Sequence, residues 1–353
     1  MTKLFYKDKP LIGLDISQTG IKVMAINPKR WLVLGYGSLD LDPVKVQTSL
    51  DNPEDTYLAE NIAVLLHKNI VGTLSSDHVV VGLPTGRTFS RTFKIPASEE
   101  RNLASAVEVE VEQYIPVPLS ALYVDYEVIG RTKDEITVVM SAVPSALVDN
   151  CIKAVRAANL EPIIAEPSIN AVARVIQATE EGHLSTLIVD IGPASTDVAV
   201  LDGGAIRVSG GVGIGGNTFT LDIAKKLNVT LENAHQLKVL NGLNPGTRQA
   251  KITAALRPSL MRIAGEIRKV IRYYNERLNE NHKIEQVLIV GGGANVPGIG
   301  EFFTNELVMA ARVASPWQRL DFGQLREPNK QFRPRYIAVA GLASLSNEEV
   351  WKK

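Results

Sequence analysis

The sequence predicts an α/β protein built from two related halves that face each other across a cleft. Three observations support this prediction. The chain has 353 residues, which is long for a single hydrophobic core. Segments 11–39 and 187–211 share one pattern of short apolar strands and small polar turns. In both segments the first strand ends in Asp-Ile, with Asp15 in one and Asp190 in the other.

The repeated pattern indicates a duplicated domain. Each copy has a strand, a polar turn, a second strand, a second turn and a third strand. We align Asp15 with Asp190 and residues 21–23 with residues 198–200, which makes the second turn two residues longer. A single strand-turn-strand unit is common in α/β proteins. Two such units with aspartate at the same place predict internal repetition.

A segment of different character, residues 87–159, lies between the two copies. Ser98 and the two glutamates after it predict the start of a helix. Residues 107–112 read VEVEVE, an alternation that fits a strand equally well, but the start signal and the apolar spacing favour a helix. A hairpin at 123–143 and a helix at 145–159 follow. The segment is therefore predicted to be a small inserted α+β subdomain.

The remaining elements of the second half are mostly helical. Asn217 or Thr218 is expected to cap a helix, and residues 230–282 have a polar helical pattern. Residues 286–290 form a short buried strand before a run of three glycines, and an apolar helix at 336–345 closes the chain.

The first turn, from Asp15 to Gly20, is suited to a phosphate group. A tight turn of small residues directs backbone N–H groups toward an anion, and the hydroxyls of Ser17 and Thr19 add donors. Lys22 brings a positive charge near the same place. Asp15 is expected to hold Mg²⁺ through water, because Mg²⁺ loses its hydration shell reluctantly. Taken alone, the same residues fit a plain hairpin with a solvated aspartate.

The second turn, residues 190–197, has the same character and one further carboxylate. Two such turns facing each other across a cleft are expected to clamp the β- and γ-phosphates of a nucleotide. Mg²⁺ would then lie between Asp15 and Asp190. Because both turns are present, this interpretation is favoured over two solvated hairpins.

Two glycine runs add candidate nucleotide contacts. Residues 211–216 match G-x-G-x-x-G, but they follow a three-strand meander past the middle of the chain, so we reject a dinucleotide site. The helix that begins there is still expected to serve phosphates through Gly215 and Gly216. The run 291–293 would let the backbone lie flat against adenine or ribose. A tight strand-helix connection is the alternative for this run.

Composition narrows the class of protein. The 38 basic and 38 acidic residues balance, so no basic field predicts nucleic-acid binding. The single Cys151 excludes an internal disulfide and suits a reducing compartment. No window reaches the ~18 apolar residues that a spanning helix needs, and the first nine residues lack the apolar core of a signal peptide. We expect a cytoplasmic protein that reaches the inner face of the cell membrane only through a partner.

Three stretches, GLDISQTGIKVM, VDIGPASTDVAVLDGG and VLIVGGGANVPG, resemble the phosphate and adenosine motifs of the actin, Hsp70 and FtsA superfamily. The stretch IPASEERNLASAVEVEVEQYIPVPLSALYVDYEVIG is similar to the inserted subdomain of the PilM family of type IV pilus assembly, and EPSINAVARV to its first connecting helix. This resemblance covers most of the chain and is weakest in residues 230–282 and 305–335.

The resemblance implies a fold and its boundaries. The fold would consist of duplicated actin-like (RNase H-like) domains that flank an ATP cleft, with an inserted α+β subdomain. The boundaries would be 1–86 with 160–182 and 335–347 for domain 1, 87–159 for the insertion, and 183–334 for domain 2 with an outer lobe at about 229–285.

The cofactors implied are ATP and Mg²⁺, with Asp15 and Asp190 as metal ligands through water. Asp190 and Glu166 are candidates for orienting a water molecule, although nothing in the sequence demands hydrolysis. Pro193 removes one backbone donor from the second turn, which weakens the case for tight phosphate binding. The implied nucleotide-binding residues are Asp15, Ser17, Gln18, Thr19, Lys22, Gly192, Ser195, Thr196, Gly215, Gly216, Gly291, Gly292 and Gly293.

The resemblance also implies partners. PilM-like proteins bind the short cytoplasmic N-terminal tail of PilN, a membrane protein with a single span, in a groove beside the inserted subdomain. They are also expected to contact the pilus assembly ATPases, and a homo-oligomer or ring is compatible with the family. Two alternatives stay open: an FtsA-like membrane tether of cell division and a small-molecule kinase of the same superfamily. The final residues, SNEEVWKK, are short and acidic for a membrane-binding helix, which disfavours the tether.

Overall fold

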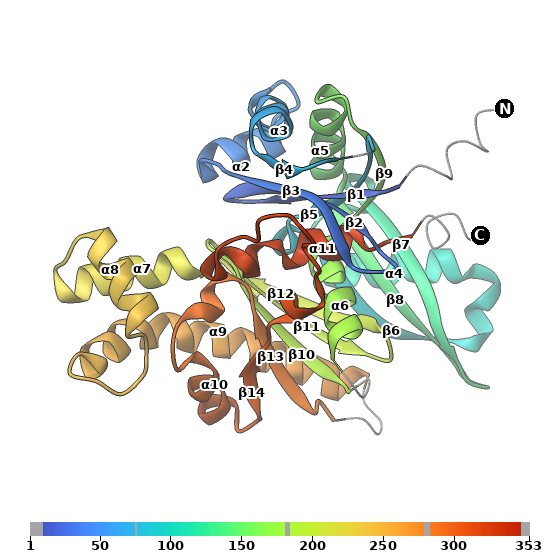
Figure 1. The fold of residues 1–353 in the computed structure, drawn as a ribbon. Helices are drawn as coiled ribbons and strands as arrows, with labels where there is room; N and C mark the ends of the chain where they lie inside the picture. The colour runs from blue at the N-terminus through green and yellow to red at the C-terminus, as the bar shows by residue number, and fades with distance from the viewer. Residues whose placement is uncertain (1–9, 75, 181–183, 279–282, 347–353) are drawn as a thin grey trace.

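The computed structural model describes residues 10–74, 76–180, 184–278 and 283–346, and it has two sheets within them (Figure 1). The first sheet has the strand order β4-β3-β2-β1-β5-β9 and the second has the order β14-β13-β10-β11-β12-β6-β8-β7. The first consists of β1 (Ile12–Ser17), β2 (Gly20–Asn27), β3 (Leu32–Asp40), β4 (Ile70–Gly72), β5 (His78–Leu83) and β9 (Glu161–Pro167). The second consists of β6 (Phe89–Pro96), β7 (Leu122–Arg131), β8 (Glu135–Pro144), β10 (Thr186–Ile191), β11 (Thr196–Asp202), β12 (Ala205–Val212), β13 (Gln286–Val290) and β14 (Ala311–Val313).

Both sheets contain the same five-stranded unit. In the first, β3, β2 and β1 form an antiparallel meander, and β5 and β9 continue the sheet as parallel strands. In the second, β12, β11 and β10 form the meander, and β13 and β14 are the parallel strands. The predicted duplication and the predicted α/β class are therefore confirmed.

The strand registers correct the alignment of the two copies. Asp15 pairs across the sheet with Lys22, and Asp190 pairs with Asp197, so the paired residues are seven positions apart in both copies. The sequence alignment that made the second turn longer was wrong by two positions. The equivalent of Lys22 in the second half is thus Asp197, a residue of opposite charge.

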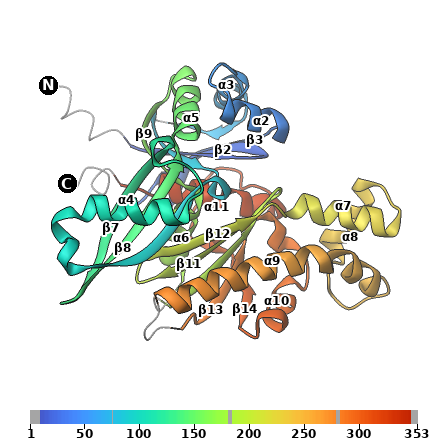
Figure 2. The same cartoon turned by 180° about the vertical axis from the view of Figure 1, so that it is seen from behind.

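Helices cover both sheets and fill the space between them (Figures 1 and 2). One group packs on the first sheet, a second pair lies between the sheets, and a third group covers the second sheet and extends into an outer lobe. The group on the first sheet consists of α2 (Pro43–Asp51), α3 (Tyr57–Lys68) and α5 (Ser145–Ala157). The pair between the sheets is α6 (Ser168–Thr179) and α11 (Ile337–Ala343). The group on the second sheet consists of α7 (Gly216–Leu227), α8 (Leu231–Leu240), α9 (Gln249–Arg277) and α10 (Ile299–Leu307).

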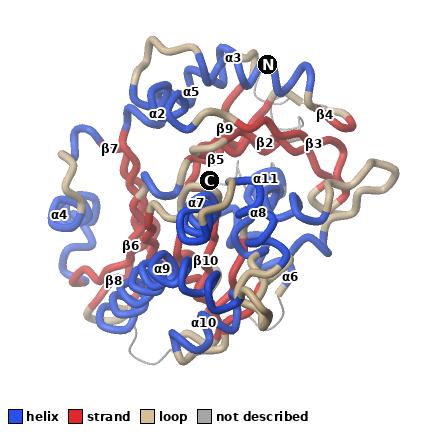
Figure 3. Tube along the Cα trace, turned by 90° about the vertical axis from the view of Figure 1, so that its left-hand side faces the viewer, coloured by secondary structure: helices blue, strands red, loops and turns tan. Residues whose placement is uncertain are grey.

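Strand β10 shows why both faces of the second sheet are covered. Leu187 and Val189 point to the core formed with α9, whereas Ile188 points to the core formed with α6 and α11. Because successive side chains of a strand alternate between faces, a run of apolar residues needs cover on both sides. Figure 3, which is turned by 90° from Figure 1, shows α9 and α11 on opposite sides of β10.

The inserted segment forms its own small core. Strands β6, β7 and β8 pack against α4 (Leu103–Tyr114), so the predicted hairpin and the helical interpretation of residues 107–112 are confirmed. A 3₁₀ segment, η2 (Ala97–Asn102), precedes that helix; it begins directly after Pro96 and has no side-chain cap. Strand β6 also pairs with β12 through Arg91 and Val208, so the insertion continues the sheet of the second half.

Helix α5 follows the insertion in the chain but packs elsewhere. Its buried residues Leu147, Cys151 and Val155 belong to the core formed by α2, α3 and the first sheet. The sequence grouped this helix with the insertion because it directly follows the hairpin. Its apolar face instead completes the cover of the first sheet.

Close contact between α6 and α11 joins the two halves at their centre. A Cβ atom on Gly341 of α11 would lie 2.0 Å from the backbone oxygen of Ala171 in α6, which is far inside van der Waals contact. Only glycine therefore allows the two helices to approach this closely.

We expect Gly341→Ala to lower the free energy of unfolding by at least about 2 kcal/mol, because the added methyl group meets backbone that cannot move aside. Urea denaturation measures this change. The matched control is Gly265→Ala in α9, where nothing lies within 4 Å of an added Cβ. That substitution should raise the stability by about 0.5–1 kcal/mol, since alanine is the better helix former. Equal effects of the two substitutions on the free energy of unfolding would contradict the close contact between α6 and α11 at Gly341.

Candidate functional site

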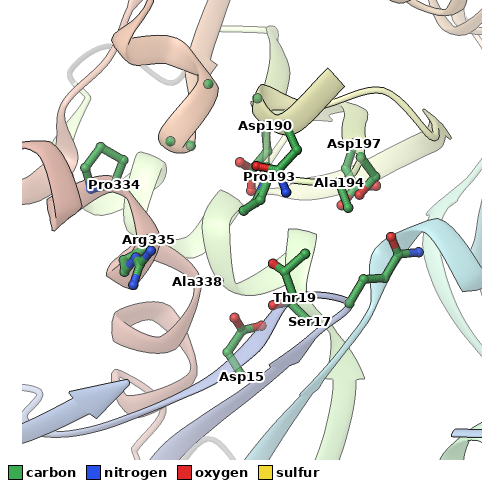
Figure 4. A pocket seen from close by; sticks show the side chains of 18 of the residues that line it. Asp15, Ser17, Thr19, Asp190, Pro193, Ala194, Asp197, Pro334, Arg335 and Ala338 are labelled. Carbon is green, nitrogen blue, oxygen red and sulfur yellow. The ribbon is translucent and has the colours of Figure 1, made fainter. Parts of the chain in front are cut away.

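A cavity of about 340 Å³ lies between the two halves, at the ends of the central strands. Its lining includes the turn from β1 to β2, the turn from β10 to β11 and the glycine run after β13. Figure 4 shows Asp15, Ser17 and Thr19 on one side of this cavity and Asp190 with Asp197 on the other. The two turns predicted to face each other therefore do so.

The first turn holds one lysine in a polar network. Lys22 Nζ donates to Asp15 Oδ2 at 3.0 Å and to Ser17 Oγ at 2.8 Å, and Ser17 Oγ donates to the carbonyl oxygen of Gly20 at 2.8 Å. Asp15 is 4% exposed. Lys22 and Asp15 share one face of the sheet because they are cross-strand neighbours.

The second turn places two carboxylates where the first turn has a carboxylate and an amine. Burial raises the pKa of Asp190 to about 6, and the nearby charge of Asp15 adds to the rise while Lys22 opposes it. Burial, and then the charge of Asp190, raises the pKa of Asp197 to about 8. Asp197 Oδ1 is buried and has no hydrogen-bond partner within the described ranges. The cavity therefore has an excess of buried negative charge that a cation would offset.

The glycine run after β13 packs directly on the second turn. Gly291 has φ of 83°, and a Cβ on it would lie 2.2 Å from Asp190 Oδ1. A Cβ on Gly293 would lie 2.1 Å from the side chain of Ile191. Glycine is thus required at these two positions because the run after β13 packs against the turn from β10 to β11. The sequence had instead suggested contact with adenine or ribose as the reason for these glycines. At Gly292 nothing lies within 4 Å of an added Cβ, so this position borders the open cavity.

The start of α7 differs from the predicted phosphate site. The N-cap is Gly215 rather than Asn217 or Thr218. The N–H groups of Gly216 and Asn217 donate to the carbonyl oxygens of Gly192 and Pro193, both at 2.9 Å. These two donors hold the second turn in place, so they are not directed at a ligand.

Helix α8 contributes a buried amine that sequence reasoning missed. Lys238 Nζ donates to the carbonyl oxygen of Gly216 and to Thr220 Oγ1, both at 2.8 Å. Burial lowers the pKa of this amine to about 8. Lys238 lines the cavity together with His235, whose pKa is lowered by burial.

The segment that leads into α11 closes another side of the cavity. Phe332, Pro334 and Arg335 line it from η6 (Lys330–Tyr336), the 3₁₀ helix that precedes α11. The Arg335 guanidinium lies 5.0 Å from the centroid of the Phe332 ring and 3.2 Å from Asp40. Figure 4 shows Arg335 and Pro334 apart from both turns, at the far side of the opening.

Most of the residues predicted for the site line the cavity, but three do not. Glu166 accepts two hydrogen bonds from Arg174, at 3.0 and 2.9 Å, and is absent from the lining. The Thr196 hydroxyl donates to the carbonyl oxygen of Ile214 in the core. Gly215 packs against the oxygen of Gly192. The predicted residues that do line it are Asp15, Ser17, Gln18, Thr19, Lys22, Asp190, Gly192, Ser195, Gly216, Gly291, Gly292 and Gly293.

The lining residues that were not predicted as site residues include Thr85, Ser168, Asp197 and Lys238. Asp197 was visible as the last residue of the second turn. Thr85 follows β5, which is parallel to β1, and carboxyl ends of parallel strands meet at one edge of a sheet. That rule could have identified it. Ser168 and Lys238 carry no comparable signal in the sequence.

The donor set suits a cation shared with a ligand better than a metal held by protein alone. Among the described residues, no group of three or more His, Cys, Asp or Glu side chains is arranged to hold a metal ion. Mg²⁺ commonly takes one or two carboxylates and completes its shell with water and phosphate oxygens. Asp15 and Asp190 provide such a pair.

The duplicated unit, the two facing turns and the cavity between them give this chain an actin-like fold. The family model described as "Type IV pilus assembly protein PilM" matches residues 13–346. The chain belongs to this family.

Solved structures agree with this fold. A "PilM-PilN type IV pilus biogenesis complex" contains a chain that is similar to this one at a TM-score of 0.77, with 23% identity over 94% of this chain and 97% of that chain. The ethanolamine utilization protein EutJ from Carboxydothermus hydrogenoformans is similar at a TM-score of 0.56, with 16% identity over 94% of this chain and 88% of that chain.

Sequence relatives include cell division proteins named FtsA. The protein from Pseudomonas aeruginosa is 32% identical over 267 residues, which is 65% of this chain and 60% of that protein. The protein from Borreliella burgdorferi is 23% identical over 192 residues, which is 48% of this chain and 45% of that protein. The chain thus matches about half the length of these relatives. Among the described residues, no helix is long and apolar enough to cross a membrane.

The lowered pKa of Lys238 predicts a pH effect on stability. An amine whose pKa falls from 10.5 to about 8 on folding makes the unfolded state bind more protons between these values, so stability should rise with pH in that range. We expect the stability of the wild type relative to Lys238→Met to increase by about 1–3 kcal/mol from pH 7.5 to 10. Urea denaturation at several pH values measures it. A difference that stays constant with pH would contradict the burial of the charged amine.

Proposed function

We propose that the cavity binds ATP with Mg²⁺ and that the protein acts as a nucleotide-dependent scaffold of type IV pilus assembly. The observation that carries the nucleotide proposal is the pair of facing turns, one with Lys22 and one with the buried carboxylates. Ser17, Thr19 and Ser195 would contact phosphate, and Asp15 and Asp190 would hold Mg²⁺ through water. Bound Mg²⁺ supplies positive charge that offsets both the phosphates and the carboxylates.

Adenosine would lie beside Gly292, where the lining is open, and η6 borders the same cavity. The Arg335 guanidinium and the Phe332 ring offer flat surfaces there. Pro193 has no N–H, so the second turn has one backbone donor fewer for a phosphate. The carbonyl oxygen of Pro193 accepts the N–H of Asn217, which is therefore also not directed at a ligand. The proposal therefore assigns the nucleotide a structural role and requires no hydrolysis.

For the partner, we propose the cytoplasmic N-terminal tail of a PilN-like membrane protein with a single span. Family membership and the printed title of the similar complex support this choice. The inserted segment offers a surface for it, because Val109 of α4 and Tyr123 and Tyr126 of β7 are exposed by 57%, 53% and 37%. Strand β7 is also the last strand of its sheet. The partner would bring this protein to the inner face of the membrane, where the pilus assembly ATPases are the proposed second contact.

We expect Asp190→Ala to weaken the binding of Mg²⁺·ATP at least tenfold, about 1.4 kcal/mol, because one of two metal-holding carboxylates is lost. Isothermal titration calorimetry measures the affinity. The control is Asp222→Ala on α7, where the carboxylate accepts from Ser259 outside the cavity. An unchanged affinity in folded Asp190→Ala protein would refute the assignment of this carboxylate.

We expect Val109→Asp to weaken binding of a synthetic peptide copied from the partner's tail, because a charge replaces apolar contact area on α4. ATP affinity should stay the same, since Val109 does not line the cavity. Fluorescence anisotropy of the labelled peptide measures the first quantity. Val44→Asp on α2, where valine is 74% exposed, is the matched control. If Val109→Asp in folded protein lowers ATP affinity as much as peptide affinity, the separation of the two sites is wrong.

A further inference from the structure

A groove separate from the central cavity lies between the C-terminal part of α9 and the end of α10. Its volume is about 360 Å³, and none of the residues that line it also lines the cavity. Figure 2 shows α9 crossing the outer side of the second sheet, with α10 beside it. A partner can therefore occupy this groove without entering the proposed nucleotide site.

The floor of the groove is apolar. Ile271 of α9, Leu307 at the end of α10 and Met309 just after it form this floor. Each of the three is partly buried on the core of the second half and keeps some surface open to the groove. A segment that lay in the groove would remove this apolar surface from water.

Val308, between the two floor residues of α10, is both exposed and strained. Its side chain is 89% exposed, so it gains little from packing within the chain. Its φ is 55°, in the left-handed region that ends α10. Glycine and asparagine are the usual residues there, because a β-branched side chain crowds the backbone. A large apolar residue that is kept in water at such a position indicates a surface used for binding.

The groove lies on the most basic helix of the second half. Helix α9 contains seven basic and two acidic residues, in a chain whose net charge is zero. Arg268 and Arg272 line the groove, and Glu276 lies at its far end. Glu306 pairs with both Arg257 and Arg268, at 3.1 and 3.5 Å, so one carboxylate serves two guanidinium groups.

Arg272 makes no hydrogen bond or ion pair with any residue that the structure describes. It lies four residues after Arg268, which places the two Cα atoms about 6 Å apart along the helix. Two carboxylates can reach both guanidinium groups if they are one turn apart on a helix or two residues apart in an extended segment. The rim thus suits a pair of acidic side chains with this spacing.

We propose that this groove binds an acidic, amphipathic segment of a protein partner. Its carboxylates pair with Arg268 and Arg272, and an apolar side chain covers the floor beside Val308. A lipid surface is flat, so its headgroups would meet the guanidinium groups and leave the floor uncovered. The inference does not depend on nucleotide binding or on the tail-binding surface of α4 and β7. It gives the proposed scaffold a second docking surface.

Selection from a phage library of short random peptides tests the chemistry of the groove. The full chain is the target, and the Arg272→Glu variant is the target of a parallel selection. We expect peptides that are enriched on the wild type alone, each with two carboxylates at the predicted spacing and a large apolar residue. If no peptide depends on Arg272, or if the dependent peptides lack paired carboxylates, the proposal is overturned.

Fluorescence anisotropy of the most enriched peptide measures its affinity. Arg272→Glu should weaken binding at least about tenfold, because repulsion replaces attraction, and Arg272→Gln should weaken it less. Affinity should also fall as salt is added. The matched control is Arg262→Glu, an exposed arginine of α9 outside the groove, which should bind as the wild type does. Equal losses in Arg262→Glu and Arg272→Glu would overturn the site, since the loss would then reflect only the net charge of α9.

Val308→Gly separates binding from folding. Glycine adopts a φ of 55° without strain, so the urea midpoint should not fall. Peptide affinity should nevertheless decrease at least about threefold, because apolar contact area is lost. A purely structural role of Val308 predicts lower stability with unchanged affinity, and that result would overturn the apolar part of the proposal.

Two other occupants are tested with the same variants. Sedimentation velocity measures self-association, and flotation with phosphatidylglycerol vesicles measures membrane binding. With the proposed occupant, Arg272→Glu changes neither quantity. Self-association that this variant abolishes would overturn the proposal in favour of a second copy, and vesicle binding that it abolishes would overturn it in favour of lipid headgroups. None of these measurements uses ATP, so their failure leaves the proposed nucleotide function intact.

Discussion

The close approach of three carboxylates at one cavity is the constraint on which the rest of this structure depends. Asp15, Asp190 and Asp197 meet at the cavity, and Lys22 is the amine bonded to Asp15. Burial is the main cause of the raised pKa values of Asp190 and Asp197, and repulsion between the neighbouring carboxylates adds to the rise. A ligand that supplies positive charge would lower the cost of such a site, which is the physical basis of the proposed cation.

The two duplicated halves carry residues of opposite charge at one equivalent position of their turns. The two turns have the same length and the same strand register, yet Lys22 of the first occupies the place of Asp197 in the second. One half thus presents an amine and a carboxylate, and the other presents two carboxylates. A phosphate chain with a metal ion needs both kinds of contact, since the amine suits the phosphate and the carboxylates suit the metal. In the proposed nucleotide site, the two halves thus share one framework and differ in the contact that each would offer to the ligand.

The sequence predicted the repeated strands and the insertion, and most of the site residues that it predicted line the cavity, because these features depend on local patterns. Apolar runs bounded by small turns fix the strands, and the position of the turns at strand ends fixes which residues share an edge. It did not predict the pairing of Glu166 with Arg174, because both residues are charged and nothing local decides their partners. Nor did it predict that β6 would join β12 through one residue pair, or that Lys238 would reach the cavity from α8. Each of these depends on tertiary packing.

The same packing places the inserted segment directly beside the cavity. Helices α6 and α11 meet at a contact that admits only glycine, so the centre of the molecule does not yield easily. The chain leaves the cavity wall at Thr85 and Gly86 and enters β6 of the inserted segment at Phe89. Because the insertion has its own apolar core, it and the centre of the molecule are packed separately, although only a few residues of chain connect the insertion to the cavity.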